Sequence, residues 1–156
     1  MPSTARKPGR HRREVIALLV GLALSTLSMA AALAGAGSGF VVVAHPSNSA
    51  VSVERAFLTD AFLKKTTRWP GDDAIYPVDQ SPDAAVRQHF SEQVLRRSVF
   101  AVRSYWQQRI FSGRGLPPPE LESDEAVLRY VLSRPGAVGY VSERTPLGAA
   151  KVLPVR

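Results

Sequence analysis

The residues best suited to bind a ligand lie where an expected strand runs into an expected helix. Residues 79–83 (DQSPD) join a short apolar run to a helical pattern that opens with Ser81, Pro82 and Asp83. Serine, proline and an acid in this order are typical of a helix start. Free backbone N–H groups at such a start can hold an anion, and Ser81 could add a hydroxyl. The same residues could equally do no more than cap the helix, because the Asp83 carboxylate competes with an anion for those donors.

Residue types for catalysis or metal binding are scarce. The chain of 156 residues has no Cys and only three His, which excludes disulfides and thiolate metal sites and argues against a His-rich metal centre. No G-x-S-x-G elbow is present, and His89 is expected on a helix flank rather than as a base. Asp72 and Asp73 follow Pro-Gly, which is typical of a turn, and lack EF-hand spacing. We therefore expect no catalytic residue, no metal, no cofactor and no enzymatic activity.

Two basic stretches allow a functional and a structural interpretation. Residues 112–115 (SGRG) could form a loop that contacts phosphate through Arg114, or could simply end a helix. Four arginines in residues 96–109 interleave with Tyr105 and Trp106, as on a surface that binds single-stranded nucleic acid. Trp106 lies on the apolar stripe of its expected helix, however, and the N-terminal pattern described below predicts export. We therefore expect no nucleic-acid partner.

The N-terminal segment has the features of a secretory signal. The net charge of the chain is +7, and residues 1–34 carry five of the basic residues and one acid. A basic stretch precedes the apolar residues 15–34, and small residues follow them, with an A-x-A sequence at 32–34. The alternative is an uncleaved anchor, because 20 residues at ~1.5 Å each could just span a bilayer. Both interpretations place residues 35–156 in the periplasm or on the outer side of the cytoplasmic membrane.

Residues 35–156 are expected to form one α/β domain. The pattern predicts strands at 40–44, 74–78 and 137–141, a further strand at 151–155, and helices at 53–65, 82–97, 99–111 and 124–134. Strands separated by helices favour a mostly parallel sheet flanked by helices. Ligands in such sheets bind beyond the carboxyl ends of the strands. Those ends are residues 45–49, 79–83 and 142–145.

Several segments together resemble a known family. They are VVVAHPSN, AFLKKTTRWPGDDAIYPVD and VLRYVLSRPGAVGYV, with FSGRG at 111–115 and the prolines that follow. In order and spacing they resemble the small phosphate ABC transporter substrate-binding protein-like group of the type 2 periplasmic-binding-protein superfamily. The resemblance runs from about residue 40 to residue 155. It implies a single periplasmic-binding-protein-like lobe, because members with two lobes that close on a ligand are longer.

The resemblance implies an exported domain that binds phosphate or a similar small oxyanion for ABC-type transport, with a transporter permease or another envelope protein as partner. The ligand contacts would be Ser47 and Asn48 after the first strand, Ser81, the N–H groups of Asp83 and Ala84, and Arg87 as the countercharge. Family members carry a Gly-Ser pair where this chain has Asp83 and Ala84, whereas Asp79 and Arg87 fit the flanking pattern. The alternative is an envelope interaction or structural protein that keeps the fold and has lost the ligand. In both cases the membrane is contacted only through the N-terminal segment, if that segment is retained.

Overall fold

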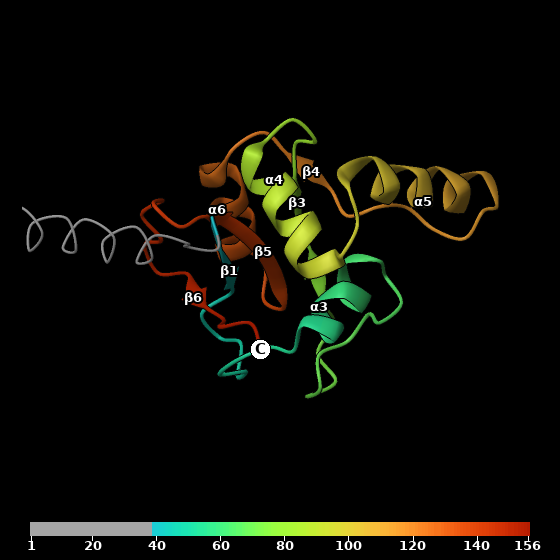
Figure 1. The fold of residues 1–156 in the computed structure, drawn as a ribbon. Helices are drawn as coiled ribbons and strands as arrows, with labels where there is room; N and C mark the ends of the chain where they lie inside the picture. The colour runs from blue at the N-terminus through green and yellow to red at the C-terminus, as the bar shows by residue number, and fades with distance from the viewer. Residues whose placement is uncertain (1–38) are drawn as a thin grey trace, which may run out of the picture. The chain divides into compact units, whose positions relative to one another are not determined.

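The computed structural model describes residues 39–156, so the predicted signal or anchor at 1–34 lies outside the described residues. None of the described helices is long and apolar enough to cross a membrane. Figure 1 shows the elements, which run in the order β1 (Phe40–Ala44), α3 (Arg55–Phe62), β2 (Tyr76–Pro77), β3 (Asp79–Gln80), α4 (Ala85–Phe90), η1 (Ser91–Leu95, a π-helix), α5 (Val99–Phe111), β4 (Glu120–Leu121), α6 (Asp124–Ser133), β5 (Ala137–Ser142) and β6 (Lys151–Val152).

Four of the strands form one sheet in the order β2-β5-β1-β6, and β3 and β4 form a separate pair. The expected α/β lobe, a sheet flanked by helices, is confirmed. Strand directions are mixed: β2 lies parallel to β5 and β3 parallel to β4, whereas β1 runs antiparallel to both β5 and β6. The apolar strand β1 is buried on both faces, apart from the half-buried Val41, but burial does not determine strand direction.

Helices cover both faces of the sheet, which explains why its central strands are apolar throughout. On one face, Val42 of β1 and Tyr140 of β5 pack against residues of α3, α4, η1 and α5. On the other face, Val43 and Val141 pack against α6. The first of these layers is rich in aromatic rings, and the Phe90 ring stacks on the Tyr140 ring with centroids 3.8 Å apart. The alternation of faces along β1 and β5 therefore places Tyr140 under α4.

The start of α4 differs from the sequence-based expectation. The helix begins at Ala85 rather than at Pro82, and its N-cap residue, Ala84, makes no side-chain capping bond. Residues 81–84 form a turn in which the Ala84 N–H donates to the Ser81 carbonyl at 3.0 Å. Two other helix starts are confirmed, because the side chains of Ser98 and Ser123 accept from the N–H three residues on, at 3.2 Å in both α5 and α6.

Candidate functional site

A buried ion pair and a tyrosine join three elements at the centre of the lobe. Asp79 of β3 pairs with Arg87 of α4, and the two residues are 3% and 1% exposed. The Tyr140 hydroxyl of β5 donates to the Asp79 carboxylate, and Arg87 Nη1 lies 3.4 Å from that hydroxyl. The structure thus pairs Asp79 with Arg87, two residues that the resemblance placed on either side of the expected anion loop. The carboxylate neutralises the guanidinium inside the lobe, so Arg87 is not a free countercharge.

Burial shifts the proton equilibria of this cluster. Loss of hydration lowers the pKa of Arg87. The nearby Tyr140 and Glu120 act in the opposite direction, but their effect is smaller. Loss of hydration also raises the pKa of Tyr140 above its usual 10.0, and this outweighs the opposing effect of the Arg87 charge. Tyr140 therefore stays protonated and able to donate to Asp79 over the whole neutral range.

Two polar atoms on this side of the helix have no partner among the described residues. They are Nε of Arg87 and the hydroxyl of Ser91, both buried. The residues are four apart, so they lie on the same face of the helix. Buried polar atoms in folded proteins are nearly always bonded to protein, water or a ligand. Each of these two atoms could therefore form one further hydrogen bond, to ordered water or to a ligand.

A pocket of about 570 Å³ borders Arg87. Arg87, although almost wholly buried, belongs to its lining, together with the exposed Arg103 of α5. Trp106 and the segment before β4 supply apolar walls, and Glu120 adds one carboxylate. The full lining is Arg87, Arg103, Trp106, Gln107, Ile110, Leu116, Pro117, Pro118, Pro119 and Glu120. Asp79 already neutralises Arg87, so Arg103 is the cation that this pocket offers to an anion, and Glu120 opposes it.

The turn at residues 81–84 is a less favourable place for an anion. The Ala84 N–H, one of the expected donors, is already bonded to Ser81. Asp83 is exposed on the turn. A second carboxylate lies at the same edge, since Asp124 accepts from the Gln80 side chain at 2.6 Å and from the Ser142 N–H at 3.1 Å. Ser81 and Asp83 are therefore close to one another but sit beside negative charge.

Ser47 and Asn48 lie at the other end of the sheet. Because β1 and β5 are antiparallel, the residues after β1 meet the start of β5, whereas residues 79–83 lie beside its end. The Ser47 hydroxyl lies 2.7 Å from Nδ1 of His45, and the Asn48 side chain accepts from the Ala50 N–H at 2.8 Å. Both residues line a separate pocket of about 580 Å³, whose one charged lining residue is Asp73. The structure therefore does not bring Ser47 and Asn48 to Ser81 or Arg87.

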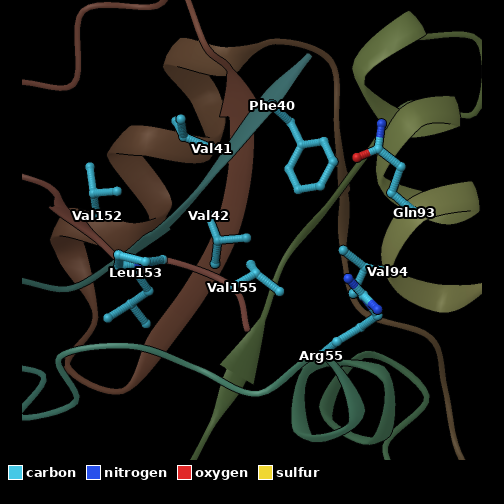
Figure 2. Close-up of a pocket in the computed structure, with 10 residues that line it drawn as sticks. Phe40, Val41, Val42, Arg55, Gln93, Val94, Val152, Leu153 and Val155 are labelled. Carbon is cyan, nitrogen blue, oxygen red and sulfur yellow. The ribbon is translucent and has the colours of Figure 1, made fainter. Parts of the chain in front are cut away.

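A further pocket, of about 330 Å³, lies beside β1 and the segment after β6 (Figure 2). Figure 2 shows Val42, Leu153 and Val155 forming an apolar wall, with Arg55 and Gln93 among the lining residues. It contains none of the residues predicted to bind a ligand. Its largely aliphatic lining suits an apolar group rather than phosphate.

Sequence reasoning missed Tyr140, Arg103 and Glu120 as parts of the central site. Tyr140 stands in an apolar strand, where a tyrosine has the same pattern as a core residue. Arg103 and Trp106 are three residues apart, and Ile110 is four residues further on, so the three side chains share one side of the helix. This spacing could have indicated a pocket wall. Among the described residues, no three His, Asp or Glu side chains are grouped so that they could hold a metal ion.

Comparison with solved structures gives this fold clear precedents. A protein assigned as a phosphate ABC transporter substrate-binding protein from Clostridium perfringens, with bound phosphate, matches with TM-score 0.59 and 16% identity over 75% of this chain and 44% of its own. An ABC-type phosphate transport receptor from Vibrio cholerae matches with TM-score 0.57 and 16% identity, over 75% and 46%. PstS from Borrelia burgdorferi matches with TM-score 0.58 and 9% identity, over 76% and 47%.

No protein-family model and no curated protein matches the chain. At these identities the structural matches show the fold alone. The chain spans less than half the length of each of these three structures. The resemblance to phosphate-transport substrate-binding proteins is thus confirmed at the level of fold.

Proposed function

We propose that this lobe binds phosphate or a similar small oxyanion, outside the cytoplasmic membrane, for ABC-type transport. Support comes from the fold, which is shared with three proteins of phosphate transport, one of them with bound phosphate. The observation that carries the site is the pocket lined by the exposed Arg103 and by Arg87, whose charge pairs with Asp79 but whose Nε has no partner among the described residues. A guanidinium is the side chain best suited to hold an oxyanion by charge-assisted hydrogen bonds.

The charges around each candidate place favour this pocket over the other two. The pocket at Ser47 and Asn48 is lined by Asp73 and by no cation. The turn at Ser81 lies beside the carboxylates of Asp83 and Asp124. Ser81 and Asp83 remain a second placement for the same ligand. Glu120 opposes an anion in the favoured pocket, so we expect weak binding, which a second lobe or a partner would strengthen.

Calorimetric titration with phosphate, and with sulfate as a second anion, tests the proposal. Replacing Arg103 by Gln removes a charge-assisted bond worth about 1.5–3 kcal/mol, so affinity should fall roughly 10- to 100-fold. Glu120→Gln should tighten binding several-fold by removing about 1 kcal/mol of repulsion. Arg129→Gln, an exposed arginine of α6, is the matched control and should leave the affinity unchanged.

Two results would contradict the proposal in different ways. If folded protein does not bind phosphate at millimolar concentration, the lobe has no oxyanion site. If it binds, but Ser81→Ala weakens the binding and Arg103→Gln does not, the anion lies at the turn instead.

The second candidate is an envelope interaction or structural protein with the same fold. It is favoured by Phe100 and Phe111, which are 79% and 90% exposed on α5, because large apolar side chains this exposed often mark contact surfaces. A folded lobe that binds no anion and keeps these two side chains exposed would fit this candidate.

Export is part of the proposal and has its own test. Cell fractionation followed by N-terminal sequencing should find the protein in the envelope or periplasm, processed near residue 34 or anchored by residues 15–34. Soluble cytoplasmic protein with residues 1–34 intact would contradict export.

A further inference from the structure

Helix α5 stands out from the lobe and carries exposed apolar side chains. Figure 1 shows it extending away from the sheet and the other helices. Phe100, Phe111 and Leu116 are 79%, 90% and 66% exposed, and Ile110 is 46% exposed. Phe100 and Phe111 are eleven residues apart, which is three helical turns, so they lie on the same side about 16 Å from one another. The exposed side of α5 thus presents an aromatic ring at each end.

Positive charge is concentrated on the same part of the chain. Residues 96–119, which we call the basic arm, contain five arginines and no acid. The other described residues contain ten Lys and Arg and twelve Asp and Glu, a net charge of −2. Arg103, between Phe100 and Phe111 in the sequence, and Arg114, in the turn after α5, are both exposed. The lobe is therefore electrically polar, with its positive end on the arm.

The inner side of the arm is held in place, so the exposed rings cannot fold inward. Trp106 is buried, and the Tyr105 hydroxyl donates to the Leu63 carbonyl at 3.0 Å. Arg109 lies 5.5 Å over the Tyr105 ring and donates to the Arg114 carbonyl at 2.8 Å. The arm consequently presents Phe100 and Phe111 outward as part of a defined structure.

From this arrangement we infer that the basic arm binds the surface of a membrane rich in anionic phospholipid. Phe100 and Phe111 enter the interface, and the exposed arginines contact lipid phosphates, as basic helices with aromatic residues do. A symmetric dimer that pairs two arms is disfavoured, because five arginines on each arm would repel one another. The rings project from the lobe and are not gathered in a groove, and a flat anionic surface can contact both ends of α5 at once. This inference goes beyond oxyanion binding and does not depend on it.

Quenching of an introduced tryptophan by brominated lipids tests the inference in the full chain. Phe111→Trp places the probe on the arm, and Val51→Trp, at a position 78% exposed outside it, is the matched control. The native Trp69 and Trp106 are 7% and 5% exposed, so the parent chain supplies the background. Both variants retain residues 1–34, so any insertion of that segment affects them equally. The vesicles are brominated phosphatidylglycerol or brominated phosphatidylcholine.

We expect at least roughly two-fold stronger quenching of Phe111→Trp than of Val51→Trp, in phosphatidylglycerol only. Quenching should decrease in 1 M salt, where the screening length falls from ~10 Å at 0.1 M to ~3 Å. Adding Arg97→Gln and Arg114→Gln should also reduce it, and neither residue lines the pocket beside Arg87.

Equal quenching of the two probes, or quenching that ignores lipid charge and salt, would overturn the inference. So would a photo-crosslinker at residue 111 that captures a protein rather than lipid in intact envelopes. Because the arginines changed here differ from Arg103, loss of lipid binding and loss of phosphate binding are separable results.

Discussion

Replacing Asp79 by Asn should destabilise the lobe more than any other change of a single charge in the described residues. Asp79 and Arg87 are 3% and 1% exposed, and Tyr140 donates to the same carboxylate. Asparagine has nearly the same volume, so the change leaves packing intact, removes the negative charge and replaces one acceptor oxygen by an NH2 donor that cannot accept from Arg87 or Tyr140. The Arg87 guanidinium then remains buried with no counterion.

Breaking a buried pair in this way costs about 3–5 kcal/mol, because one charge stays desolvated and unpaired. A lobe of this size has a free energy of unfolding of about 5–15 kcal/mol, so the variant loses a large share of it. The Lys65–Asp60 pair offers a matched control, with a separation of 3.3 Å and both side chains about half exposed, at 53% and 48%. Asp60→Asn should cost less than about 1 kcal/mol, because water screens that pair.

Urea unfolding at pH 7, followed by tryptophan fluorescence, measures both free energies. Adding Arg87→Met to Asp79→Asn should recover part of the loss, because it removes the unpaired charge. If Asp79→Asn and Asp60→Asn differ by less than about 1 kcal/mol, the reasoning is refuted, since Arg87 would then be hydrated.

Three further predictions concern packing, pH and the backbone. Trp106→Ala should cost roughly 3–5 kcal/mol in urea unfolding, whereas Phe111→Ser, at a position 90% exposed, should change stability by less than about 0.5 kcal/mol. Burial raises the pKa of Tyr140 above the unfolded value of 10.0. The contribution of Tyr140 to the free energy of unfolding is therefore complete below about pH 10 and is lost as the pH rises further. Above pH 10, Tyr140→Phe should remove a decrease of about 1.4 kcal/mol per pH unit in the free energy of unfolding. Gly136→Ala should lower the melting temperature, at a cost of about 1–3 kcal/mol, because its φ is +81° and an added Cβ would lie 2.1 Å from the Ala74 carbonyl oxygen; an unchanged transition would show that the turn rearranges freely.

Local signals in the sequence predicted most of the elements. Ser98 and Ser123 mark helix starts that the structure confirms, because a serine N-cap depends only on the next few residues. The start expected at Ser81 failed for a non-local reason. The Ser81 N–H donates to the Leu121 carbonyl, next to the β3–β4 pair, so the chain is held extended and turns before α4 can begin. The partner is 40 residues away in the sequence, and no local pattern indicates it.

In the candidate site, too, local sequence placed some residues, and contacts between distant segments placed others. Asp79 and Arg87 are brought together because a short turn separates a strand end from the next helix, whereas the sequence had indicated Arg87 only as a countercharge for the ligand. Ser47 and Asn48 are placed elsewhere, because β1 runs antiparallel to β5, and an apolar strand has the same composition in either direction.

Composition and periodicity alone predicted an α/β domain with helices between apolar strands, since the hydrophobic pattern follows directly from which side chains avoid water. Only the tertiary structure decided that Arg87 is paired inside the lobe, that Tyr140 and Arg103 approach it from β5 and α5, and that Phe100 and Phe111 face outward. These facts depend on strand order and direction and on contacts between distant residues. Many arrangements satisfy the same local pattern, and the packing of the whole lobe selects one of them.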